Sequence, residues 1–500
     1  MLSWIQSHPA LSASRLAPLV VLLAFMGAAA ATGVVVASGN LVMIGLAVGA
    51  VLGVLLLNFI GVAVWIVLVG TLLIGGPLTM HAPQFTRVGW LFSMLGFFLL
   101  GAAALYEGTN RDPHRPAVPA FIVIALLFLV YATGTLFASD ATLGENVSAF
   151  KRYFQYWGLA LILATVAFDP RTVRRWLLLL LGLALLQLPF AIYQRLVLVP
   201  RRVNMPNNVL PIDIVAGTFE GSLTGGASNN IMAFFVIATI AGLLCVYRES
   251  MIRRPVLWLL LSVVGAPLAL GETKLAVVLL PTALLVVYAD LVRKRPVAFA
   301  AGALVAAVAI GTLAYSYLIL HNTDGRDLTL QQRLDENLEY NVGSRGYYGG
   351  ASLNRGNVVQ FWWREHGAHD PVRTLFGHGL GASFGSSGGT DPGGLMDRKY
   401  PGYAIGLTAV SALLWDVGLL GTALYVAMFA AAFFTAARLT ARASPGLDRA
   451  MCRTLQASVA MMPLMLAALD THLMTPSIQV LTAFTLGLIA WRWRRGTRSS

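Results

Sequence analysis

The stretch LNRGNVVQFWWREHGAHDPVRTLFGHGLGASFGSSGG, residues 353–389, belongs to the one long hydrophilic segment of this 500-residue chain, residues 321–404. Apolar runs precede and follow that segment almost without interruption. Any chemistry on a water-soluble group is therefore expected within residues 321–404 or directly beneath them.

The composition indicates a membrane protein. Hydrophobic residues make up 57 % of the chain and charged residues 11 %, and the mean hydropathy is +0.73. Several uncharged apolar windows of about 18 or more residues are long enough to cross a hydrocarbon core of about 30 Å. We predict an all-α fold, a polytopic membrane helix bundle of about fourteen spans with one large periplasmic loop carrying short helices. Residues 1–320 hold spans 1–11, residues 321–404 the loop with the active-site helices, and residues 405–500 spans 12–14 and a cytoplasmic tail.

Short basic loops predict the orientation. Basic clusters at 171–175, 248–254, 293–295, 438–453 and 492–498 fall on one side when every span is counted. The excess of Lys and Arg in cytoplasmic loops then places both termini in the cytoplasm and the large loop in the periplasm, with the protein in a bacterial inner membrane. The net charge of +13 fits such loops and anionic lipid head groups, and no nucleic-acid motif accompanies it.

Metal and disulfide sites are not expected. The two cysteines, Cys245 and Cys452, fall at predicted cytoplasmic helix ends, and no Cys/His spacing typical of a metal site is present. We predict no cofactor.

Within the loop, residues 328–340 read as a short amphipathic helix and residues 343–350 as a glycine-rich break. Residues 353–366 read as a second helix. The glycine-rich run 377–389 cannot form a regular helix, and residues 405–415 lead into the next span.

Two motifs lie on either side of residues 405–415, one in the loop and one at the start of the next span. Arg355 is followed 22 residues later by Gly377-His378-Gly379-Leu380-Gly381, and then by Asp416-Val417-Gly418-Leu419-Leu420-Gly421 at the start of a span. This arrangement resembles the O-antigen ligase and O-antigen polymerase superfamily. The resemblance implies a GT-C-like bundle whose loop arginines hold the pyrophosphate of an undecaprenyl-linked glycan.

The candidate substrate-binding residues are cations on the predicted outer side. A planar guanidinium forms paired hydrogen bonds with phosphate oxygens and stays charged at any working pH. Because negative charge grows on a departing pyrophosphate, preorganised cations lower the barrier of the reaction as well as bind. The set is Arg355, Lys274, Arg202, Arg201, Arg345, Lys151 and Arg152.

A further patch of the same family is similar to Gly217-Thr218-Phe219 with Asn229-Asn230. Family members often have an arginine directly before this patch, whereas this chain has residues 213–216, DIVA. A second arginine ligand would have to come from Arg201 or Arg202 by folding of the loop.

Glu272 and Lys274 interrupt an apolar run and sit at the predicted periplasmic edge. They form either a tight turn in which the charges neutralise each other, or a site in which Lys274 binds phosphate and Glu272 acts as general base. His366 and His378 are the other catalytic candidates, although a structural role is open for His378. The sequence around Asp470 and His472 is weaker support for a site.

These features favour a membrane glycosyltransferase, a polysaccharide polymerase that transfers an undecaprenyl-pyrophosphate-linked glycan to the next lipid-linked repeat unit. We expect the transfer to need no metal and to invert the configuration at the anomeric carbon. Its partners would be donor and acceptor oligosaccharides on undecaprenyl pyrophosphate, membrane lipids and a chain-length regulator protein, with no nucleic acid.

Three alternatives stay open. An O-antigen ligase would transfer the glycan to lipid A-core, but its histidine, nine residues before the Asp416 motif, is replaced by Leu407. A transporter or flippase for lipid-linked oligosaccharides would show repeated halves and charges near the bilayer midplane. A structural scaffold of the cell envelope would use the loop for docking.

Overall fold

The computed structural model describes residues 33, 59–82, 89–109, 117–137, 139–203, 211–221, 228–271, 273–297, 299–300, 352–385 and 393–496, with isolated residues between 302 and 348. The first two predicted spans, most of the eleventh and most of the predicted helix 328–340 lie outside the described residues.

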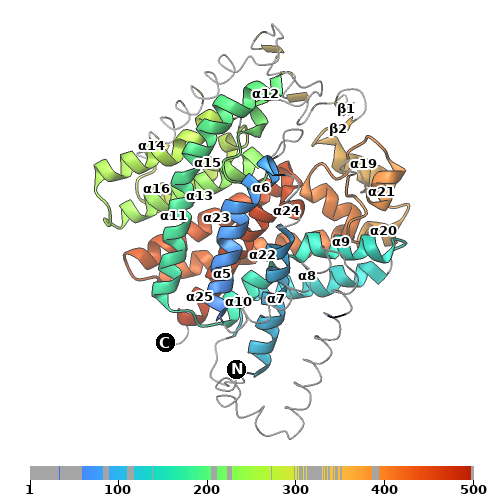
Figure 1. The fold of residues 1–500 in the computed structure, drawn as a ribbon, viewed down its shortest axis with the longest axis horizontal. Helices are drawn as coiled ribbons and strands as arrows, with labels where there is room; N and C mark the ends of the chain where they lie inside the picture. The colour runs from blue at the N-terminus through green and yellow to red at the C-terminus, as the bar shows by residue number, and fades with distance from the viewer. Residues whose placement is uncertain are drawn as a thin grey trace, which may run out of the picture.

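The described part is an α-helical bundle (Figure 1). Its helices are α5 (Ile60–Val69), α6 (Gly76–His81), α7 (Gly89–Thr109), α8 (Ala120–Phe137), α9 (Leu143–Phe154), α10 (Trp157–Thr165), α11 (Pro170–Tyr193), α12 (Val199–Val203), α13 (Ser228–Arg248), α14 (Arg254–Leu270), α15 (Ala276–Val287), α16 (Ala289–Lys294), α19 (Asn357–Glu365), α20 (Pro371–Phe376), α21 (Leu395–Lys399), α22 (Ala409–Arg442), α23 (Leu447–Ala468), α24 (Thr471–Met474) and α25 (Pro476–Gly496). Two π-helical segments, η2 (Gly70–Gly75) and η4 (Gln194–Leu198), continue α5 and α11, and η5 (Pro211–Ile214) is a 3₁₀ turn. Strands β1 (Tyr347–Tyr348) and β2 (Ser352–Leu353) form a short antiparallel pair.

Seven helical stretches among the described residues are long and apolar enough to cross a membrane. They are Ile60–His81, Gly89–Gly108, Ala120–Phe137, Pro170–Arg202, Ser228–Arg248, Ala409–Arg442 and Leu447–Ala468, and α14 and α15 are shorter apolar helices. The prediction of an all-α membrane helix bundle is therefore confirmed at this level, while the count of about fourteen spans stays a prediction.

Basic helix ends gather at one end of the bundle, which we call the basic end. Ion pairs join them there: Arg248–Asp290, Arg453–Asp290, Arg449–Glu249, Arg492–Asp448 and Arg494–Glu107. Since α23 begins beside this end, its last residue, Ala468, lies at the opposite end. We call that opposite end the loop end because residues 352–385 and 393–405 pack there.

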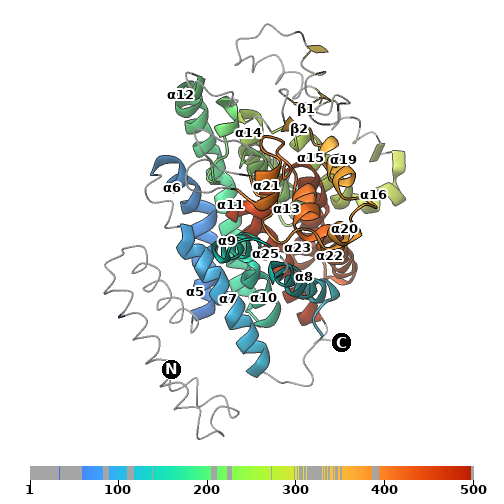
Figure 2. The same ribbon diagram turned by 90° about the vertical axis from the view of Figure 1, so that its right-hand side faces the viewer.

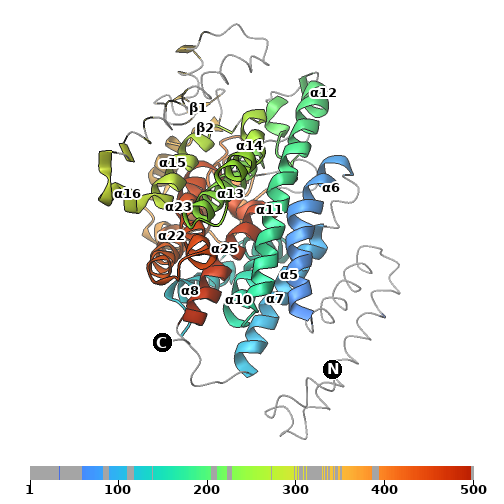
Figure 3. The same cartoon turned by 90° about the vertical axis from the view of Figure 1, so that its left-hand side faces the viewer.

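The loop helices α19, α20 and α21 gather on one side of the bundle (Figure 1), and the view onto that side shows them together near α22 (Figure 2). From the other side, α11, α13 and α14 lie side by side (Figure 3). The loop helices pack on α22 through an apolar core, in which Trp362, Trp415, Val358 and Ile405 are buried. The loop is thus packed as an integral part of the fold.

Local sequence signals account for the helix starts at the loop end. Thr142 and Glu145 form a capping box before α9, and Thr408 and Ser411 form one before α22. The Asp370 side chain accepts a hydrogen bond from the Arg373 N–H and caps α20. The helix predicted over 353–366 is shorter, since it begins at Asn357, after a turn that contains Arg355.

Candidate functional site

The two motifs of the sequence pack against each other. The His378 N–H donates to the Trp415 carbonyl and the Gly379 N–H to the Asp416 carbonyl, both at 2.9 Å. Residues 377–381 therefore bind the backbone of α22 in its first turns. The predicted absence of a regular helix in this run is confirmed for residues 377–385.

Two glycines permit this close contact. Gly377 has φ +73°, and a Cβ there would lie 2.5 Å from the carbonyl carbon of Asp416. Gly418 has φ +65° inside α22, and a Cβ there would lie 2.4 Å from the backbone of Leu375. Only glycine fits both demands, because other residues pay for positive φ and have no room for a side chain here.

The Asp416 carboxylate anchors this junction. It is fully buried and accepts hydrogen bonds from the Gly381 N–H at 2.9 Å, the Ser383 N–H at 2.8 Å and the Tyr153 hydroxyl at 2.8 Å. Burial and the neighbouring carboxylate raise the pKa of the Tyr153 hydroxyl well above its usual range, so that it remains a donor. The Asp416 motif thus has a structural task in this chain: it holds the glycine-rich loop, α9 and α22 together.

The two catalytic candidates His366 and His378 contact each other. Their Nε2 atoms lie 2.7 Å apart, and Nδ1 of His366 lies 3.0 Å from the Trp362 carbonyl. A carbonyl can only accept, so Nδ1 of His366 carries the hydrogen of that bond, and the two Nε2 atoms share a second hydrogen bond. Burial, followed by the positive charges of neighbouring groups, lowers the pKa of His378 to about 4.

This histidine pair is separated from Arg355 by the whole of α19. Nine helical residues at 1.5 Å per residue place the two ends of α19 roughly 14 Å apart. Both rings also pack on Trp415. The pair therefore links the end of α19 to the glycine-rich loop, while Arg355 lies at the other end of the helix.

Arg355 itself is fixed at the loop end of α23. Its Nε donates to the Ala468 carbonyl at 2.6 Å, and Nη1 donates to Oδ1 of Asn341 at 2.8 Å. Asp470 lies nearby: burial raises the pKa of its carboxyl group to about 6, while the Arg355 charge acts in the opposite direction. The Arg355 guanidinium and the Asp470 carboxyl group are thus neighbours at the loop end of α23. The sequence offers only weak support for a site at Asp470.

Lys274 lies at the same end of the bundle. The chain turns there between α14 and α15, and α15 reaches the basic end at Val287, where the Val287 carbonyl accepts from Arg453. Lys274 is exposed. The turn packs on the segment just before Gly217, because a Cβ at Gly271 would lie 3.0 Å from the Val215 carbonyl oxygen.

Arg202 lies close to Asp213, which binds Asn229. The loop therefore folds so that Arg202 comes near the asparagine pair, as a second arginine ligand from this position would require. Arg202 is 2 % exposed, and Asp213 is close enough for its charge to act on the guanidinium. Asp213 accepts from Asn229 at 3.3 Å, and Asn229 accepts from Asn230 at 2.8 Å. The neighbouring Arg201 is exposed instead.

Lys151 and Arg152 lie in the last turn of α9 and contact aromatic rings. The Lys151 Nζ lies 3.5 Å from the ring centre of Trp90, and burial followed by the charge of Arg152 lowers the pKa of Lys151 to about 8. The Arg152 guanidinium lies 4.8 Å from the ring centre of Phe384. These two cations are thus partly withdrawn from solvent.

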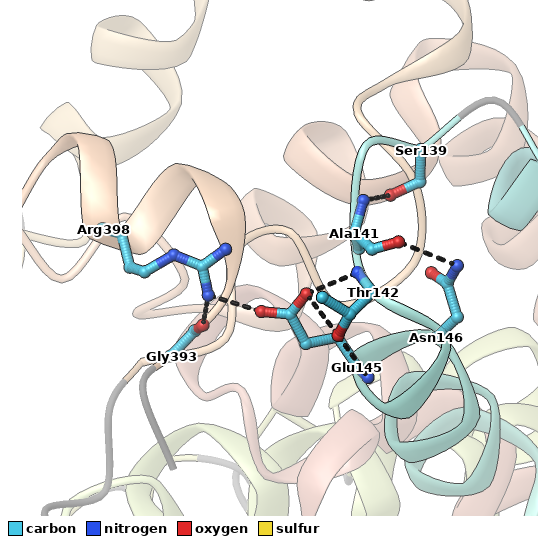
Figure 4. A network of polar contacts seen from close by, with 7 residues as sticks. All are labelled: Ser139, Ala141, Thr142, Glu145, Asn146, Gly393 and Arg398. Atoms are coloured by element: carbon cyan, nitrogen blue, oxygen red, sulfur yellow. Dashed lines mark hydrogen bonds and ion pairs between the residues drawn. The ribbon is translucent and has the colours of Figure 1, made fainter.

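A cleft of about 50 Å³ opens beside Arg152, between α9 and the glycine-rich loop. Figure 4 shows the polar network at its rim, where Glu145 accepts from Arg398 at 2.6 Å and from the Thr142 N–H at 2.7 Å. Arg398 also donates to the Gly393 carbonyl at 2.6 Å. The network joins α21 to the start of α9.

Glu272 and Arg345 lie outside the described residues. The roles proposed for them remain predictions from sequence. Within the described ranges, no group of three or more His, Cys, Asp or Glu side chains is arranged to hold a metal ion.

Sequence reasoning missed two features of this end of the bundle. Glu220 directly follows Gly217-Thr218-Phe219 and accepts a hydrogen bond from Ser477 of α25. Because Ser477 is 257 positions away, this contact leaves no pattern in the local sequence. Asn341 is a ligand of Arg355 whose position depends on the loop as a whole.

No protein-family model matches this chain. No curated protein matches it at a significant level either.

Proposed function

We propose that this protein is a membrane glycosyltransferase that transfers an undecaprenyl-pyrophosphate-linked glycan to the next lipid-linked repeat unit, a polysaccharide polymerase. The observation that carries the proposal is the fixed position of Arg355. Its guanidinium is oriented by Ala468 and Asn341 at the loop end of a membrane helix bundle. A lipid diphosphate would present its phosphates at this depth.

The chemistry requires stabilisation of a leaving diphosphate. The acceptor hydroxyl attacks the anomeric carbon, the bond from that carbon to the diphosphate oxygen breaks, and the electron pair leaves with the lipid diphosphate. Arg355 would bind the diphosphate oxygens, and preorganised charge of this kind acts most strongly on the transition state. Lys274, which is exposed at the same end of the bundle, would neutralise part of the remaining charge.

Asp470 suits the task of orienting Arg355. A carboxyl group beside a guanidinium limits the directions in which the guanidinium can point, and the contact with Ala468 fixes it further. In this proposal the loop end faces the periplasm, and the basic end faces the cytoplasm of a bacterium in accordance with the distribution of Lys and Arg.

The test is to incubate the purified protein with lipid-linked repeat units extracted from the producing strain. A ladder of products that grows by whole repeats supports the polymerase. A single product on another acceptor would instead identify a ligase, and unchanged substrate that crosses a vesicle bilayer would identify a transporter.

A further inference from the structure

Residues 216–220 form a loop that two π-helical segments hold in place. Gln194, the first residue of η4, accepts at Oε1 from the Ala216 N–H at 3.0 Å and the Gly217 N–H at 2.8 Å, and donates from Nε2 to the Gly217 carbonyl at 2.7 Å. Gln187 of α11 accepts from the Thr218 N–H at 2.9 Å. π-Helical turns occur frequently at functional sites.

The second π-helical segment holds the loop from the other side. The Thr218 hydroxyl donates to the Leu72 carbonyl of η2 at 2.7 Å. A Cβ at Gly76 would lie 2.1 Å from the Thr218 carbonyl oxygen, so the backbones touch. The loop of residues 216–220 is therefore held rigidly from both sides, and this fixes the position of the Glu220 carboxyl group.

Glu220 carries the one acidic side chain of this loop. The hydroxyl of Ser477, in the first turn of α25, donates to its Oε2, and Oε1 lies 4.0 Å from the position of a Cβ on Gly75. Burial raises the pKa of the Glu220 carboxyl group to about 7, although the residue as a whole is only half-buried. A carboxyl group in this state exchanges a proton near neutral pH.

Buried polar side chains continue inward from Glu220. Tyr156 is close enough to be affected by the charge of Glu220, and its hydroxyl lies 3.2 Å from Thr71 and 3.5 Å from Ser93. Ser93 donates to Gln155 at 2.7 Å. Each link satisfies a polar group within an apolar bundle, so the arrangement keeps the region of Glu220 polar.

The same network reaches the region of Arg152. Gln155 donates to Gln479 at 2.8 Å, and Gln479 donates to the Arg152 carbonyl at 2.7 Å. The contacts therefore join the loop of Glu220, η2, α7, the break between α9 and α10, and α25. These five elements meet at one polar cluster, and the proposed diphosphate site at Arg355 and Lys274 does not use it.

We propose that Glu220 is the catalytic residue that accepts the proton of the acceptor hydroxyl in the transfer described above, an inference that rests on the proposed function. As the new bond between the acceptor oxygen and the anomeric carbon forms, the hydroxyl proton passes to the Glu220 carboxylate. The bond to the diphosphate breaks, and Glu220 then releases the proton to solvent.

The relative placement of Glu220 and Arg355 suits this role. Arg355 is anchored on Ala468, just before α24, and Glu220 on Ser477, just after it. The two anchoring residues are nine positions apart in the chain, and the single helical turn α24 (Thr471–Met474) lies between them. Arg355 and Glu220 are thus anchored on either side of α24, at the same end of the bundle.

The histidine pair is less suited to the task. Nε2 of His366 and Nε2 of His378 are engaged with each other, and the pair lies at the far end of α19. Asp470 lies against Arg355, on the side of the leaving group. A base must instead lie on the side from which the acceptor attacks.

The test compares Glu220→Gln and Glu220→Asp with the wild type in two assays: elongation of lipid-linked repeat units from pH 5 to pH 9, and binding of undecaprenyl diphosphate. Glu249→Gln, the same change at the basic end, is the matched control. We expect Glu220→Gln to lower the elongation rate about 10²–10⁴-fold with undecaprenyl diphosphate binding unchanged. Glu220→Asp should retain part of the rate, with a displaced acid limb in the pH profile.

The outcomes separate the two claims. Elongation by the wild type and equally by Glu220→Gln would overturn the role of Glu220 while leaving the polymerase intact. Absence of elongation and of undecaprenyl diphosphate binding in the wild type would overturn the proposed function itself. Loss of both elongation and binding in Glu220→Gln, with Glu220→Asp inactive and well folded, would show a binding role and also overturn the inference.

Discussion

The Tyr153 hydroxyl lies 2.8 Å from Oδ2 of Asp416, and this hydrogen bond joins α9 to the kinked start of α22. The two residues are 263 positions apart in the chain. Because the carboxylate is fully buried and also binds the Gly381 and Ser383 N–H groups, the whole loop end depends on it.

Tyr153→Phe removes one donor from this carboxylate and leaves the other two. We expect it to lower the free energy of unfolding by about 1.5–3 kcal/mol, the usual contribution of a hydrogen bond to a charged group. Denaturant unfolding in detergent measures this difference. Tyr193→Phe, where the ring packs on His81, should change little, and equal losses in both variants would contradict the role of Asp416.

Gly377→Ala and Gly418→Ala should prevent correct packing of the glycine-rich loop. In each case the added Cβ would overlap backbone atoms at 2.4–2.5 Å, and φ is also positive. Gly402→Ala separates the two effects, since Gly402 has φ +82° and open space around it. We expect a loss of about 1–3 kcal/mol for Gly402→Ala, from backbone strain alone, and markedly lower yields of folded protein for the other two. Similar yields for all three would contradict the packing described.

Much of this arrangement could be predicted from sequence. Apolar windows predict the helices, and the turn chemistry of 377–381 excludes a helix there. Sequence also marks Arg355 and the Asp416 motif, yet it does not show that Asp416 binds the loop instead of substrate. That depends on Tyr153 and on main-chain N–H groups, which leave no pattern in the chain.

The limits are clearest for pairs that are distant in sequence. His366 and His378 are separately visible as histidines, but their shared hydrogen bond follows from the bend between α19 and α20. Glu220 is bound by Ser477, 257 positions away. Tertiary packing of this kind decides which polar residues meet, and local periodicity carries no information about it.

The histidine pair should make stability depend on pH. The pKa of His378 is lowered from 6.5 to about 4 in the folded protein, so below pH 6.5 the unfolded chain binds more protons than the folded protein. Stability from this group is therefore present above about pH 6.5 and is lost as the pH falls toward 4. His378→Gln should remove this part of the pH dependence in thermal unfolding from pH 4 to pH 7.5, whereas parallel curves for both proteins would contradict it.

Arg355→Ala and Lys274→Ala should each abolish elongation of lipid-linked repeats without reducing expression. Arg355→Lys should also be strongly impaired, because an ammonium group cannot reproduce the paired hydrogen bonds of a guanidinium. Arg364→Ala, an exposed position on α19, is the control and should elongate normally. Normal polymer from both single variants, Arg355→Ala and Lys274→Ala, would contradict the proposal that these two cations bind the diphosphate.

The binding of undecaprenyl diphosphate to the purified protein tests the central claim most directly, because it isolates the diphosphate from the acceptor and from the chemistry. Titration of the wild type, Arg355→Ala and Arg364→Ala in one detergent gives the comparison. We expect tight binding by the wild type and by Arg364→Ala, and binding at least tenfold weaker by Arg355→Ala. Equal affinity of Arg355→Ala and the wild type would contradict the proposal that this guanidinium holds the lipid diphosphate.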